Sequence, residues 1–299
     1  MAMDWRLLAT LLITVDSLSS AALADNARDW QNTPIDLNML FGYYNLVDTN
    51  TPIDTSLPIK GLSLNANVYI LRYARSFDVD GRNTAIEILQ PYADLDASFD
   101  NAQYFSGTKH NGGRGDTQLV FAHNFIGGPA LTAEQFAKWT PGTFFSGAVT
   151  LTTPTGDYDR NRVINIGSNR WVVKPELAFG TPIGPTWLEF NTYVSLYGDN
   201  DKYQGSNKLE QKPLYAIESH YSYTINRALW VGLDATYSTG GETRIEGADQ
   251  GNKQENTKRT RPASFAKAAN SGSTASTATA APRTSRWPMP LASRHCSST

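Results

Sequence analysis

The stretch from Trp187 to Tyr197 reads W-L-E-F-N-T-Y-V-S-L-Y and alternates with a period of two residues. Its even positions are apolar apart from Thr192, and its odd positions are polar or aromatic. This alternation is typical of a β-strand with one apolar face. Its length suits a tilted membrane-spanning strand, which needs ~9–11 residues, better than a globular strand of ~5–6 residues.

The same alternation recurs along most of the chain. It is clear over residues 62–70, 89–99 and 229–237, weaker over 35–45, 117–126, 143–153, 171–180 and 213–225, and a tenth strand is expected from near Glu242. Short turns such as Asp80-Gly81 are interspersed with longer polar loops over 46–61, 100–115 and 198–211. Lipid offers no hydrogen-bonding partner to an open sheet edge, so strands of this kind must close into a barrel. The pattern predicts an all-β fold, an antiparallel up-and-down transmembrane β-barrel with about ten readable strands.

The first 24 residues have the features of a signal peptide. Arg6 precedes an apolar run over Leu7–Val15, and Ala22-Leu23-Ala24 forms a small-residue cleavage pattern. The alternative is a buried N-terminal helix, which the polar run from Asp25 onward disfavours. The pattern predicts cleavage after Ala24 and export of the rest of the chain.

The composition excludes two other classes of protein. Residues 25–258 carry 26 acidic and 19 basic side chains, a balance that gives no support to nucleic-acid binding. The single cysteine, Cys296, lies near the end of the sequence, so the exported body is not a disulfide scaffold.

The last stretch of the chain differs from the body. Residues 259–299 carry six basic and no acidic side chains, are interrupted by prolines and show no alternation. We therefore expect the barrel domain to cover 25–258 and the residues after it to form an aberrant, disordered tail that a shifted reading frame encodes. The alternative is a genuine disordered basic arm.

No motif in the sequence predicts catalysis, a metal site or a cofactor. Asp78-x-Asp80-Gly81 begins like a calcium loop, but the position of the closing glutamate is Leu89. His110, His123 and His220 have no metal-ligand spacing, and no G-x-S-x-G nucleophile motif occurs. The sequence therefore predicts a protein that is not an enzyme.

Charged side chains on the polar faces of the predicted strands are candidates for lining the barrel lumen. Lys174 and Glu176 lie two residues apart on one face, close enough to form an ion pair. Such a pair has a structural interpretation, in which it fills the barrel, and a functional one, in which it contacts a solute. The lumen candidates are Asp94, Asp96, Lys174, Glu176, Glu189, Glu218, His220 and Asp234.

One motif carries a family resemblance. From Asn165 to Glu176 the chain reads N-x-G-x-N-R-W-x-x-K-P-E. Two earlier segments accompany this motif: F-A-H-N-F-I-G-G-P-A begins at Phe121, and P-T-G-D-Y-D begins at Pro154. These segments resemble the outer-membrane transporters of the "putative meta-pathway of phenol degradation" family, and the resemblance covers residues 34–258. The motif residues are Asn165, Gly167, Asn169, Arg170, Trp171, Lys174, Pro175 and Glu176.

The resemblance implies a single outer-membrane barrel, with twelve strands in an intact relative, that passes small hydrophobic or aromatic compounds. It supplies no catalytic residues. Family members continue past the Gly-Gly-Glu-Thr segment with further strands and end on an aromatic residue, so the last strands are expected to be missing here. The expected partners are membrane lipid, small apolar or aromatic solutes and the barrel-assembly machinery.

Two other functions remain open on the sequence. The barrel could be a structural or adhesive element of the surface that conducts nothing. It could also be a soluble periplasmic barrel that binds a ligand, although lipid-like apolar faces along every strand disfavour this.

Overall fold

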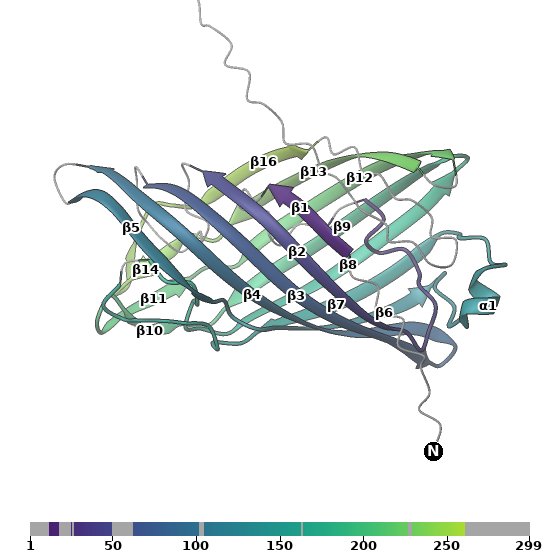
Figure 1. The fold of residues 1–299 in the computed structure, drawn as a ribbon, viewed down its shortest axis with the longest axis horizontal. Helices are drawn as coiled ribbons and strands as arrows, with labels where there is room; N and C mark the ends of the chain where they lie inside the picture. Colours follow the sequence, from purple (N-terminus) through teal and green to yellow (C-terminus); the bar gives the residue numbers. More distant parts are fainter. Residues whose placement is uncertain are drawn as a thin grey trace, which may run out of the picture.

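The structure is a computed structural model that describes residues 12–17, 25, 27–49, 62–101, 105–162, 164–226 and 229–260. Long strands make up most of it and curl into a tube, with one short helix at one end (Figure 1). No helix in the described part of the chain is long and apolar enough to cross a membrane.

Ten strands pair with their neighbours in an antiparallel meander. In sheet order they are β2 (Asn38–Thr49), β3 (Leu62–Val79), β4 (Arg82–Asn101), β6 (Gln118–Ile126), β7 (Phe144–Thr152), β8 (Val172–Ile183), β9 (Thr186–Tyr197), β12 (Leu214–Asn226), β13 (Leu229–Gly240) and β16 (Gln254–Thr260). β5 (Phe105–Arg114) pairs with the far part of β4, beyond the part that pairs with β6. The predicted antiparallel transmembrane barrel is confirmed as the fold class.

The tenth strand lies later in the chain than the sequence predicts. Thr243–Ile245 (β14) belongs to a separate four-stranded sheet, which we call the outer sheet. It also contains β10 (Asn200–Tyr203), β11 (Asn207–Gln211) and β15 (Ala248–Asp249). The tenth barrel strand is β16, which also extends two residues past the predicted domain boundary at residue 258. After β13 the chain turns at Gly240 and Gly241, which both adopt the positive φ that glycine tolerates. It then enters the outer sheet as β14 and β15 before it returns to the barrel as β16. The remainder of the predicted tail, residues 261–299, lies outside the described residues.

The two ends of the main sheet do not pair with each other in the described part of the chain. β16 pairs with β13, and at the other end β1 (Leu12–Ser17) runs parallel to β2. β1 falls within the predicted signal peptide and is shorter than the ~9–11 residues that a membrane-spanning strand needs. Removal of that peptide would leave β2 as an edge strand, and its cleavage stays a prediction.

The alternation predicted for Trp187–Tyr197 is present in β9. Phe190 and Leu196 are exposed on the outer face, whereas Glu189, Asn191 and Ser195 are buried on the inner face. The neighbouring strands repeat this arrangement, with Leu177, Ile217 and Leu233 among the exposed residues. The barrel is therefore apolar outside and polar inside, the reverse of a soluble domain.

The short helix α1 (Ala133–Phe136) lies at the end of the barrel that carries the tight turns (Figure 1). Thr132 and Gln135 form its capping box. The chain before it is anchored to the β3–β4 turn, because the Ala130 N–H donates to the Gly81 carbonyl at 3.0 Å. The helix thus lies beside the barrel rim.

Candidate functional site in the barrel lumen

Four neighbouring strands, β8, β9, β12 and β13, turn charged and polar side chains to the inside of the barrel. The strand register aligns His220 with Glu189 on one side and with Asp234 on the other. The inward set comprises Lys174, Glu176, Glu189, Asn191, Glu218, His220 and Asp234, all of them buried. Six of the eight lumen candidates named from the sequence are therefore in one cluster.

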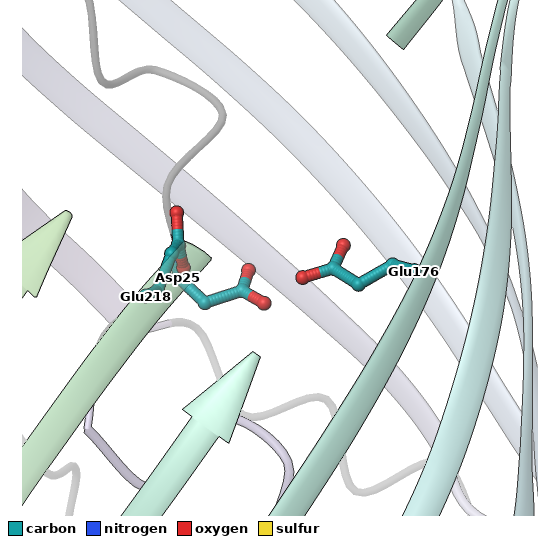
Figure 2. A group of neighbouring side chains, drawn as sticks. All are labelled: Asp25, Glu176 and Glu218. Carbon is teal, nitrogen blue, oxygen red and sulfur yellow. The ribbon is translucent and has the colours of Figure 1, made fainter. Parts of the chain in front are cut away.

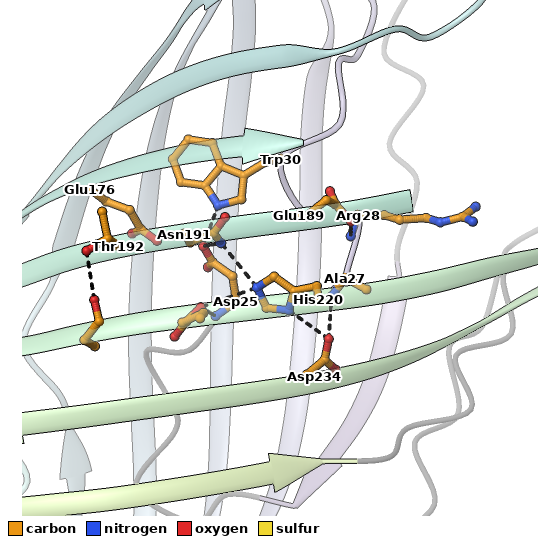
Figure 3. Close-up of polar contacts among 12 residues, drawn as sticks. Asp25, Ala27, Arg28, Trp30, Glu176, Glu189, Asn191, Thr192, His220 and Asp234 are labelled. Atoms are coloured by element: carbon orange, nitrogen blue, oxygen red, sulfur yellow. Dashed lines mark hydrogen bonds and ion pairs between the residues drawn. The ribbon is translucent and has the colours of Figure 1, made fainter. Parts of the chain in front are cut away.

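A segment before the first barrel strand, residue 25 and residues 27–37, lies against this set from the inside (Figure 3). Three of its backbone N–H groups donate to wall carboxylates: Asp25 to Glu218 (3.1 Å), Ala27 to Asp234 (3.1 Å) and Arg28 to Glu189 (2.9 Å). Irregular backbone away from water needs such partners. The wall acids thus serve as acceptors for what we call the N-terminal segment.

The N-terminal segment also binds a distant part of the wall. The Asn83 side chain donates to Asn32 Oδ1 at 2.7 Å, and the Ser76 hydroxyl donates to the Pro34 carbonyl at 2.7 Å. Ser76 and Asn83 are buried on β3 and β4, which β6 to β9 separate from β12 in the sheet order. The segment therefore bridges two sections of the wall and occupies the space between them.

Two side chains of the N-terminal segment fasten it further. Arg28 donates through Nε to Ser222 at 2.9 Å and through Nη2 to Thr224 at 2.8 Å. Its guanidinium also lies over the Trp230 ring, 4.6 Å from the centroid. Sequence reasoning missed this segment, because period-two alternation detects strands, and residues 25 and 27–31 form neither strand nor helix.

His220 is held between acidic groups. Its Nδ1 lies 2.8 Å from Asp234 Oδ1 and its Nε2 lies 3.6 Å from Glu218 Oε2. Asn191 lies 3.4 Å from the same Nε2. The described partners of His220 include no hydroxyl or thiol group that could act as a nucleophile. His220 is thus part of a buried network of acidic and polar side chains.

The ion pair expected between Lys174 and Glu176 is present. Lys174 Nζ lies 2.9 Å from Glu176 Oε2, and both side chains are buried. The ammonium also lies 4.6 Å from the centroid of the Tyr193 ring. This geometry favours the structural interpretation, in which the pair fills the barrel.

Three carboxyl groups meet at the centre of the site (Figure 2). Ligand oxygens of Asp25, Glu176 and Glu218 all lie within 4.8 Å of one another. One oxygen of each glutamate, Oε1 in both, is buried without a hydrogen-bond partner among the described residues. A buried carboxyl group keeps its charge only beside a positive charge and otherwise binds a proton.

Asp94 and Asp96 are placed differently from the prediction. They share the outer face of β4 with the exposed Ile88 and Tyr92, while Leu95 is buried on the inner face. His110 on β5 lies 3.1 Å from a carboxylate oxygen of each. We attribute the reversal to β4 extending beyond the lipid, where the outer face of a barrel meets water and becomes polar. The lumen prediction for these two residues was therefore wrong.

The family motif begins in a loop that is tied down by its own side chains. Asn165 Oδ1 accepts from the Asp159 N–H at 2.8 Å, and Asn165 Nδ2 donates to the Asp159 carbonyl at 3.1 Å. Gly167 passes so close to Gly156 that a Cβ on it would lie 2.7 Å from the Gly156 carbonyl carbon. The backbone N–H of Arg114 donates to Asp157 at 2.8 Å, which lowers the pKa of that exposed carboxyl. Asn165 and Gly167 thus have a structural role here.

The second half of the motif joins this loop to the outer four-stranded sheet. Asn169, at a φ of 53°, donates to Asn200 at 2.8 Å. Arg170 is buried, donates to Gln211 at 2.5 Å, and lies over the Tyr197 ring. Trp171 directly precedes β8 and Pro175 lies within it. The Trp171 side chain is exposed, as the tryptophans of an interface belt are. Lys174 and Glu176 are the motif residues that belong to the lumen cluster.

A small aromatic cavity lies between the N-terminal segment and the loop that holds α1. Its lining includes Phe136, Trp139, Phe144 and Trp187, with Gln31 on the segment side. Its volume is about 50 Å³. A dry protein cavity that binds benzene measures about 150 Å³, so no aromatic ring fits without movement of the surrounding chain.

Fold and site together define a membrane-type β-barrel that is apolar outside and whose polar lumen is occupied by its own N-terminal segment. The chain belongs to the family described as "Putative MetA-pathway of phenol degradation", which matches residues 48–263. The fold is similar to that of an outer membrane channel from Pseudomonas putida F1, at a TM-score of 0.64 and 24% identity over 78% of this chain and 83% of that one. No protein with a curated description matches the sequence significantly.

Proposed function

We propose that the chain forms an outer-membrane channel for passive diffusion of small apolar or aromatic compounds, and that its N-terminal segment closes the lumen in the described state. The observation that carries the proposal is the reversed polarity of the wall. Phe190 and Leu196 face outward, while Glu189 and Asn191 on the same strand are buried inside. A wall of this kind faces lipid on one side and a polar interior on the other.

Family and fold support both the location and the solute class. The family description refers to phenol degradation, and the similar solved structure is described as an outer membrane channel. We carry these properties to this chain as part of the proposal. The proposal also includes export after cleavage behind Ala24, insertion by the barrel-assembly machinery, and contact with lipid and aromatic solutes. It includes no catalytic role for the lumen residues.

A second candidate function is a structural or adhesive barrel that conducts nothing. The observation that favours it is the occupied lumen: Glu218, Ser222 and Asn191 are almost completely buried. The cavity beside α1 is also too small for an aromatic ring. The two functions differ in whether the N-terminal segment moves.

Solute flux into vesicles separates the two candidates. We expect purified protein in vesicles to admit benzenesulfonate faster than empty vesicles do, because the sulfonate group stays ionised and the bilayer alone passes this aromatic anion slowly. Sucrose serves as the control for nonspecific leakage, and heat-modifiable migration in gels confirms folding. Absence of benzenesulfonate flux through folded protein would favour the non-conducting barrel.

A further inference from the structure

The lumen network around the carboxylate cluster holds more acidic than basic side chains. Five acids take part in it: Asp25, Glu176, Glu189, Glu218 and Asp234. The basic side chains that contact these acids are Lys174 and His220, whereas Arg28 donates to Glu189 through its backbone N–H. Lys174 contacts Glu176 through Oε2, and the guanidinium of Arg28 is directed to Ser222 and Thr224. The unpartnered Oε1 atoms of Glu176 and Glu218 thus lack a described donor.

The backbone nitrogen of Asp25 is already in contact with this cluster. It donates to Glu218 Oε2 at 3.1 Å. Asp25 is also the residue that follows the predicted cleavage point after Ala24. Cleavage converts this nitrogen from an amide with one N–H into an ammonium group with three N–H donors and a positive charge.

We propose that the α-ammonium group of Asp25, formed by signal-peptide cleavage, is the missing cation of the cluster, and that it anchors the N-terminal segment in the lumen. One donor binds Glu218 Oε2, and the others have the free Oε1 atoms of Glu176 and Glu218 as acceptors. This rests on the proposed function, because it requires export and a lumen closed by the segment. It adds that proteolytic processing completes the closed state.

A divalent metal ion is the competing occupant of the cluster. Calcium takes 6–8 oxygen ligands, whereas the cluster offers three carboxyl groups. One oxygen of Asp25 is already occupied, since Oδ2 accepts from Trp30 Nε1 at 2.6 Å and from Asn191 Nδ2 at 3.2 Å. The nearby nitrogen and the few free oxygens therefore favour an ammonium group over a metal.

The test compares the processed protein with a variant that carries Gly-Ser inserted between Ala24 and Asp25. The insertion moves the ammonium group away and leaves an amide at Asp25. Mass spectrometry first establishes the N-terminal residue of each protein. Hydrogen exchange of residues 25–37 then measures how often the segment leaves the lumen. We expect at least about tenfold faster exchange in the extended variant, because hydrogen bonds to charged groups are stronger than neutral ones and their loss lets the segment open more often.

Glu218→Gln in both backgrounds shows whether the ammonium is the partner of Glu218. We expect this substitution to speed exchange in the processed protein and to have little further effect in the extended one. Equal effects in both would mean that Glu218 acts structurally, and would overturn the proposal. So would a mature protein that begins at another residue, or exchange that a chelator speeds and calcium restores. None of these readouts depends on solute flux, so a non-conducting barrel would be recognised separately.

Discussion

Lys174 and Glu176 show how a single buried charge depends on its partner. Both are buried and their charged atoms lie 2.9 Å apart. Replacing one partner leaves the other charge buried and uncompensated, which typically costs 3–5 kcal/mol, whereas replacing both by neutral groups of similar size costs far less. We expect Lys174→Met to destabilise the folded barrel by several kcal/mol and Lys174→Met with Glu176→Gln to recover most of that loss.

Urea unfolding in lipid vesicles, followed by tryptophan fluorescence, measures these free energies. Glu134→Gln on the exposed part of α1 serves as a matched control for removing an acid. A double variant at least as unstable as Lys174→Met would show that the pair does not act as a unit.

At the residue scale, the sequence predicts the inward charges well but not their partners. Period-two alternation placed Lys174, Glu189 and Glu218 on the inner face, because strand geometry alone decides the face. It failed for Asp94 and Asp96, since alternation does not tell where a strand leaves the lipid. It gave no prediction for the N-terminal segment, whose hydrogen bonds to β9 and β12 span more than 160 positions of sequence.

Strand β9 allows its outward face to be tested directly. Val194 lies on the face of Phe190 and Leu196, so an arginine there must enter lipid. We expect Val194→Arg to cost about 2–4 kcal/mol of folding free energy if the position lies near the bilayer midplane. Ile183→Arg is the matched control, because Ile183 is the last residue of β8, beside the Gly184–Pro185 turn. An arginine near the membrane interface should cost only about 0–1 kcal/mol.

Folding into vesicles of defined lipid measures both variants. Equal costs at the two positions would contradict the assignment of the lipid-facing surface. Ser195→Arg would not serve as a control, because Ser195 is buried on the inner face. An arginine there would overpack the lumen and destabilise the barrel independently of lipid contact.

At the element scale, strand existence follows from the sequence and strand limits do not. The alternation from Trp187 to Tyr197 predicts β9 almost to the residue. β3 and β4 run on well past the predicted segments, and Thr243–Ile245 leaves the barrel for the outer sheet. Propensity cannot separate these cases, because the outer sheet is decided by long-range contacts such as that of Arg170 with Gln211.

For the whole molecule, closure of the sheet is the main requirement. Among the described residues, β16 and β2 would both be edges of the sheet once residues 1–24 were removed, and an unpaired edge in lipid costs several kcal/mol per bare backbone group. We expect the gene to encode two further alternating strands, ending in an aromatic residue, in another frame after about codon 258. Restoring that frame should raise the amount of folded protein in outer-membrane fractions. If no frame contains such strands, the basic-arm interpretation of residues 259–299 takes its place.

The central claim is that the N-terminal segment closes a conducting lumen, and a reversible disulfide tests it most directly. A Cβ at Gly232 would lie 3.3 Å from the Cβ of Ala27, close to the ~3.5–4.5 Å of a disulfide. The protein carries Ala27→Cys, Gly232→Cys and Cys296→Ser, and each single-cysteine variant serves as a control. The measurement is benzenesulfonate flux into vesicles before and after reduction. We predict flux near that of empty vesicles when the disulfide is formed and restored flux after reduction, whereas equal flux in both states would contradict the claim.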